Sequence, residues 1–178
     1  MPSTVIRTSH PLDPLAGNEF RQATAILRRD QNVDDRWRFA SIELGEPSKA
    51  EVANFDDAGA IPDRRAIVVC FNRDTNRTYK ALVSLSDDKT LSWTHLPGVQ
   101  ANLTVDEWHE AGDALVRHPE VVAALRRRGV TENDKLLIDV WAYGDLMVPE
   151  AHRGRRLAWS DTWVKSPGGA NPYANHLR

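Results

Sequence analysis

Cysteine is almost absent from this chain, which has a single one, Cys70, among 178 residues. An internal disulfide is therefore excluded. Cys70 lies in the apolar run 66–71, so we expect a small buried core residue there rather than a nucleophile. Long apolar runs are missing too: no window of about 18 residues is apolar enough to span a membrane, and residues 1–10 are too short and polar for a secretory signal. The resulting interpretation is a cytoplasmic protein.

An excess of charge of either sign is also missing. The chain has 23 Lys and Arg against 25 Asp and Glu, a net charge of -2. Such a balance creates no long-range field that would attract nucleic acid or an anionic membrane, so neither is expected as a partner. Arginines at 126–128 and within 153–156 are interpreted as a helix C-terminus and a solvated strand end.

Motifs for metal binding and nucleophilic catalysis are absent. None of the six histidines follows another by one, three or four residues, so no local chelate can be written, although a site built from distant histidines stays open. No Gly-x-Ser-x-Gly segment indicates a serine hydrolase, which would need a nucleophile and base clustered by the fold. We therefore predict neither catalytic nor metal-binding residues.

The first half of the chain has the pattern of a helix followed by strands. Asp13 and Pro14 are typical of a helix start, and apolar spacing continues to Arg29. A strand with a bulge is predicted at 36–46, and a surface strand or loop at 49–62. Polar turns then separate three predicted strands, at 66–71, 78–85 and 90–95.

The second half repeats this order after a break at Leu96-Pro97-Gly98. Thr104 and Glu107 fit a capping box at the start of a helix. A shorter helix is predicted at 120–128, and strands at 136–142 and 157–164.

Helices followed by antiparallel strands, twice over, indicate an α+β fold with helices on one face of each small sheet. The predicted domains are 9–96 and 97–178. The second has fewer strands than the first, which indicates that it is truncated and that the chain is the front of something longer.

Six tryptophans are a large number for a chain of 178 residues. Trp37, Trp93 and Trp163 lie in predicted strands, where core packing explains them. Two more aromatic positions in the second half, Trp108 and Trp141, and Tyr173 in the tail, fit either a core or an interface.

Several segments, in this order and spacing, resemble the two N-terminal peripheral domains, the second and third, of copper- and topaquinone-dependent primary-amine oxidases. The resemblance covers nearly the whole chain, and the tail at 175–178 departs from it. The segments are His10–Leu15, Arg38–Leu44 with Glu46–Pro47 and Lys49–Val52, Arg64–Ala66, Ser92–Trp93 with Leu96–Gln100, Gly154–Ala158, and Asn171–Ala174.

The resemblance implies a parent enzyme that converts primary amines to aldehydes, releasing ammonia and hydrogen peroxide. It also implies that copper, held by three histidines, the topaquinone made from a tyrosine, and an aspartate base all belong to a C-terminal β-sandwich domain of a homodimer. The sequence contains no Asn-Tyr-Asp or Asn-Tyr-Glu motif and no His-x-His pair. This chain is therefore expected to hold no cofactor and to be inactive alone.

The resemblance further implies two cystatin-like domains that pack against the outside of the catalytic part. Residues at the positions of Trp108, Trp141 and Tyr173 border the mouth of the family's substrate channel, and apolar walls suit the hydrocarbon part of an amine. The expected role is scaffold and channel rim. The alternative is a stand-alone module that binds a protein or small ligand through exposed tryptophans.

Overall fold

The computed structural model describes residues 10–131, 135–144, 148–165, 171–174 and 177. Residues 175, 176 and 178, where the sequence departs from the family resemblance, lie outside the described part. Contacts divide the chain into two compact units, Met1–Ala101 and Asn102–Arg178. Both combine helices with an antiparallel sheet, which confirms the predicted α+β class.

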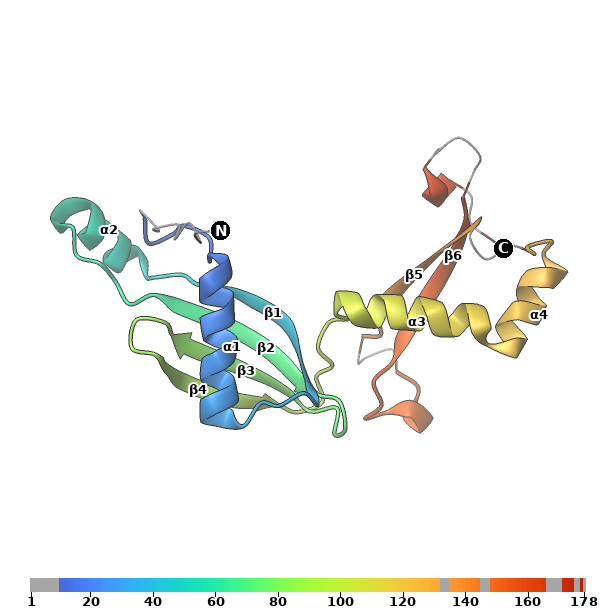
Figure 1. Cartoon of the computed structure of the whole chain (residues 1–178), viewed down its shortest axis with the longest axis horizontal. Helices are drawn as coiled ribbons and strands as arrows, with labels where there is room; N and C mark the ends of the chain where they lie inside the picture. The colour runs from blue at the N-terminus through green and yellow to red at the C-terminus, as the bar shows by residue number, and fades with distance from the viewer. Residues whose placement is uncertain (1–9, 132–134, 145–147, 166–170, 175–176, 178) are drawn as a thin grey trace, which may run out of the picture. The chain divides into compact units, whose positions relative to one another are not determined.

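The first unit is a four-stranded antiparallel sheet with strand order β1-β2-β3-β4. Helix α1 (Gly17–Gln31) lies across one face of this sheet (Figure 1). The strands are β1 (Trp37–Gly45), β2 (Arg65–Asn72), β3 (Thr78–Ser84) and β4 (Lys89–Leu96). The predicted bulge in the first strand is confirmed by a register shift between Phe39 and Ser41.

The core of the first unit lies between α1 and the sheet. Ala23, Ile26 and Leu27 recur at helical spacing and are fully or almost fully buried. They belong to one apolar cluster with alternate residues of the central strands, and Trp37 and Trp93 pack at its margin as predicted; the strand residues are Ala66, Val68, Ala81 and Val83.

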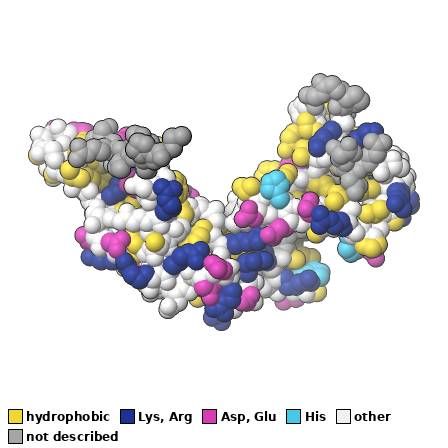
Figure 2. Space-filling view, viewed as in Figure 1, with side chains coloured by type: hydrophobic (Ala, Val, Ile, Leu, Met, Phe, Trp, Pro, Cys, Tyr) yellow, Lys and Arg dark blue, Asp and Glu magenta, His cyan; other side chains and the backbone are white. Residues whose placement is uncertain are grey.

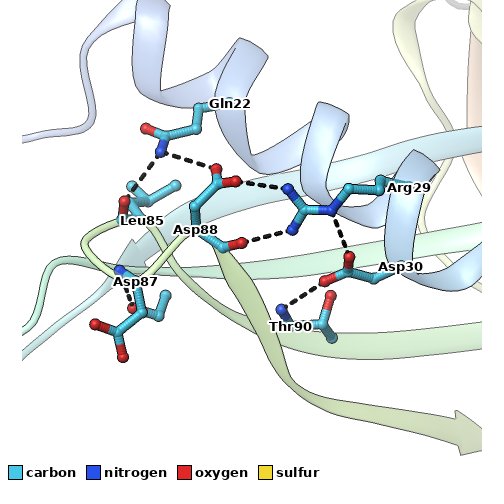
Figure 3. Close-up of polar contacts among 8 residues, drawn as sticks. Gln22, Arg29, Asp30, Leu85, Asp87, Asp88 and Thr90 are labelled. Carbon is cyan, nitrogen blue, oxygen red and sulfur yellow. Dashed lines mark hydrogen bonds and ion pairs between the residues drawn. The ribbon is translucent and has the colours of Figure 1, made fainter.

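Polar contacts tie α1 to the turn between β3 and β4 (Figure 3). Gln22 Nε2 donates to the carbonyl of Leu85 at 2.9 Å. Arg29 forms ion pairs with Asp30 on its own helix and with Asp88 in the turn. These contacts hold the helix over the sheet at two points, Gln22 and Arg29.

The start of α1 differs from the prediction. The helix begins at Gly17, not at Asp13–Pro14. Asp13 instead accepts a hydrogen bond from the amide of His10 at 2.9 Å. Glu19, in the first turn, accepts from the amide of Ala16 at 2.7 Å and so supplies the capping group that Asp13 was expected to provide.

Residues 49–58 form a helix, α2 (Lys49–Ala58), so the predicted surface strand or loop is wrong there. Ser48 and Glu51 form a capping box, in which each side chain accepts from the other residue's amide. Gly59, with φ of 68°, ends the helix in the left-handed region. No residue of α2 is buried, which explains why its sequence lacks an apolar period.

The second unit contains two helices, α3 (Val105–Arg117) and α4 (Pro119–Arg127), and a two-stranded antiparallel sheet of β5 (Leu136–Ala142) and β6 (Ala158–Val164). Short 3₁₀ turns occur at Glu150–His152 and Pro172–Ala174. The predicted capping box of Thr104 and Glu107 is confirmed. Four buried residues form the core between helices and sheet: Leu125, Leu136, Ile138 and Val140.

Basic and acidic side chains lie interspersed on the face shown in Figure 2, without a patch of one sign. This distribution agrees with the near-zero net charge.

Candidate functional site: an aromatic pocket beside α3 and β5

A pocket of about 300 Å³ lies in the second unit, between the start of α3 and the end of β5. We call it the α3–β5 pocket. Trp108 and Trp141, two of the three predicted site residues, both line it, and its walls are mainly apolar. The lining residues are Asn102, Leu103, Thr104, Val105, Trp108, Asp139, Val140 and Trp141.

An ion pair fixes the α3 side of the pocket. Arg156 donates to both carboxylate oxygens of Glu107, to Oε2 at 2.8 Å, and also to the carbonyl of Asn102 at 3.0 Å. Burial by itself would raise the pKa of Glu107, but hydrogen bonds from Arg156 and Thr104 outweigh it, so the pKa is lowered. Glu107 is thus an anion that holds the helix start and the Asn102 wall together.

Asp139 lies at the centre of the predicted residues, and sequence reasoning did not single it out. It is only 8% exposed. Its Oδ1 accepts from the indole Nε1 of Trp108 at 3.4 Å, and its Oδ2 accepts from the hydroxyl of Tyr173 at 3.2 Å. Asp139 therefore connects Tyr173, which does not line the pocket itself, to a pocket wall.

Asp139 affects the pKa of Tyr173. Burial, the charge of Asp139 and the hydrogen bond to it all raise the pKa of the Tyr173 phenol. The ring also packs edge-on against Trp163, with centroids 5.3 Å apart. Tyr173 is nevertheless about half exposed.

Trp141 extends the aromatic surface out of the pocket. Its indole is 53% exposed and stacks on that of Trp159, its register partner on β6, with centroids 6.2 Å apart and an angle of 18°. Trp141 is therefore not a core residue of the second unit.

The described residues contain neither a cluster of metal-binding side chains nor an exposed thiol. No group of three or more His, Cys, Asp or Glu within them could hold a metal ion. Cys70 is fully buried, and burial raises the pKa of its thiol to about 12, in agreement with the core role predicted for it. No described helix has the length and apolar character needed to cross a membrane.

Comparison with known proteins identifies the family to which the chain belongs. Residues 10–96 match the family described as "Copper amine oxidase, N2 domain". The chain belongs to the copper amine oxidase family, in agreement with the resemblance seen in its sequence.

Individual relatives match this chain over only a part of their own length. A primary amine oxidase of Arthrobacter sp. (strain P1) is 36% identical over 174 residues, which are 97% of this chain and 26% of that protein. A peroxisomal copper-containing diamine oxidase of Nicotiana tabacum is 30% identical over 189 residues, 87% of this chain and 24% of its own length. The chain thus spans about a quarter of the length of these relatives.

A solved structure supports the fold. The copper-containing benzylamine oxidase of Hansenula polymorpha aligns with a TM-score of 0.73 and 20% identity, covering 95% of this chain and 27% of the oxidase. At this identity the likeness shows the fold, and it matches the N-terminal domains of that oxidase.

Proposed function

We propose that this chain is the non-catalytic N-terminal region of a primary-amine oxidase and serves as scaffold and substrate-channel rim. The observation that carries the proposal is the mainly apolar α3–β5 pocket. Trp108 and Trp141 both line this pocket, and Tyr173 is hydrogen-bonded to Asp139, another of its lining residues. Pockets of this kind suit the hydrocarbon part of an amine.

The proposal assigns the chemistry to a catalytic β-sandwich domain of the same parent chain, in a homodimer. That domain would supply copper and topaquinone for the conversion of a primary amine to aldehyde, ammonia and hydrogen peroxide. The family membership supports this division of labour. We extend the proposal to a cytoplasmic location, which cell fractionation would test.

The direct test is an activity assay on the purified chain. With copper and benzylamine added, we expect neither hydrogen peroxide nor a quinone absorption band. The copper-containing benzylamine oxidase of Hansenula polymorpha, treated in the same way, is the positive control. Turnover accompanied by a quinone band in the chain alone would refute the non-catalytic assignment.

A second candidate is a stand-alone interaction module, which the exposed stacked pair of Trp141 and Trp159 favours. The nucleotide sequence after codon 178 distinguishes the two. An in-frame continuation with a His-x-His pair and an Asn-Tyr-Asp or Asn-Tyr-Glu motif supports the oxidase, and a stop codon without such a continuation supports the module.

A further inference from the structure

We infer that Asp139 is an anchor for the ammonium group of an amine that enters the α3–β5 pocket. This inference rests on the proposed channel-rim function and adds to it a charged recognition element, an aspartate that neither the sequence pattern nor the comparisons assign. The ligand class is an organic monoamine cation with an apolar body.

The first argument is the state of the Asp139 carboxylate. Asp139 is only 8% exposed, and the two donors that hydrogen-bond to its carboxylate, an indole and a phenol, are both neutral. Within the part of the chain that the structure describes, no Lys, Arg or His forms an ion pair with it. A buried carboxylate without a cation is unfavourable, and two donors leave about half of its lone-pair positions open. A cationic ligand would neutralise the carboxylate and also donate hydrogen bonds to its open lone-pair positions.

The second argument is the charge around the pocket. Among the described residues that line it, Asp139 is the only one with a charged side chain. The nearby Arg156 is already paired with Glu107, and this pair is neutral as a unit. The local excess is therefore negative, which favours a cation over an anion.

The third argument is the nature of the walls. Trp108 and Trp141 both line the same pocket as the Asp139 carboxylate, and indole faces attract ammonium groups. Three aliphatic side chains, Leu103, Val105 and Val140, complete the walls and suit a hydrocarbon or aryl body. One buried carboxylate matches one ammonium group, which points to a monoamine.

The experiment is an NMR titration of the purified chain with benzylamine below the pKa of the amine, with benzyl alcohol as the uncharged analogue. The readout is the indole N–H resonance of Trp108, assigned with Trp108→Phe. We expect benzylammonium to shift this resonance and to bind at least about tenfold more tightly than benzyl alcohol. Above the pKa of benzylamine this preference should disappear.

Two matched variants locate the effect. Asp139→Asn keeps the size and one acceptor oxygen of the side chain but removes the charge, so affinity for benzylammonium should fall about tenfold or more and the preference for the amine over benzyl alcohol should be lost. Asp113→Asn makes the same charge change at an exposed position of α3 and should leave both affinities unchanged. Dispersed amide resonances establish that each variant is folded.

Equal affinity for the amine and the alcohol in the unsubstituted chain would overturn the inference, and this comparison needs no variant. No shift at Trp108, or equal amine binding by Asp139→Asn and the unsubstituted chain, would also overturn it. None of these outcomes touches the non-catalytic role, which fails only if the chain alone produces peroxide and a quinone band.

Discussion

The ion pair between Arg64 and Glu19 should be a principal determinant of the first unit's stability. Arg64 donates to both oxygens of the Glu19 carboxylate, at 2.8 and 3.1 Å, and to the carbonyls of Pro11 and Pro14, each at 3.0 Å. The side chains are only 15% and 12% exposed. Replacing Arg64 by methionine keeps much of the volume but removes all four of these hydrogen bonds.

The magnitude follows from what the substitution leaves behind. Glu19 would keep the amide of Ala16 as a donor but lose its counter-charge in a poorly hydrated position. Breaking a fully buried pair costs about 3–5 kcal/mol, and the residual exposure of this pair reduces the expected loss to about 2–3 kcal/mol. For a unit of this size, that corresponds to a fall in Tm of roughly 10–20 °C.

Urea unfolding followed by amide resonances of β2 and β3 measures this loss separately from the second unit. The matched control is Arg28→Met, because Arg28 pairs with Asp35, whose side chain is 99% exposed. Exposed pairs contribute less than about 1 kcal/mol. If Arg64→Met costs no more than Arg28→Met, the buried pair is not the stabilising element that its geometry indicates.

The same pair predicts a pH dependence. The hydrogen bond from Arg64 is the main cause that lowers the pKa of Glu19 below its ordinary value. The pair's contribution to stability is thus complete above the unfolded-state pKa, about 4.3, and is lost as the pH falls through the lower folded-state pKa. Acid titration of the free energy of unfolding should show this loss in the unsubstituted chain but not in Glu19→Gln; parallel curves would contradict the assignment.

Further predictions concern single residues. Cys70 should not react with a thiol reagent at pH 8 until the chain unfolds, because its thiol is buried and its pKa is about 12; rapid labelling of the native chain would contradict this. Gly45→Ala should destabilise by about 1–3 kcal/mol in urea, because the new Cβ would lie 2.9 Å from Cβ of Arg65. Gly112→Ala, in α3 with open space around it, should stabilise by about 0.5–1 kcal/mol and is the matched control. Ultraviolet titration should find Tyr173, identified by Tyr173→Phe, ionising above an ordinary tyrosine.

The strands and the main helices could be predicted because their buried positions appear as regularly spaced apolar residues in the local sequence. Apolar or alternating runs bounded by polar turns predicted the six strands found among the described residues, and the register shift in β1 was visible as a change of phase from Phe39 to Ile42. Helix α2 shows the converse. It packs no buried residue, so no apolar period exists to be detected, and its one clear signal was the Ser48 and Glu51 capping box.

The site could be predicted only in part, because its central residue is defined by distant contacts. Trp108, Trp141 and Tyr173 were singled out through the family resemblance. Asp139 carries no motif, and its burial depends on partners 31 and 34 residues away in the sequence. A strand aspartate between apolar neighbours is an unusual feature, and that was the only local sign of it.

The two units share a device that their sequences do not reveal as a repeat. In each, a glutamate in the first turn of the main helix accepts from the amide at the helix start, and an arginine just before a strand donates to both of its oxygens: Arg64 with Glu19, and Arg156 with Glu107.

Each arginine also donates to a carbonyl of the segment that leads into the helix, Pro11 and Pro14 in the first unit and Asn102 in the second. One guanidinium thereby joins three parts of a unit that are far apart in sequence: the approach to the helix, its first turn and the sheet. Arg suits this role since its planar donors can reach a carboxylate and a carbonyl together. In the second unit the carbonyl belongs to a pocket wall, so the clamp that stabilises the fold also fixes the shape of the α3–β5 pocket.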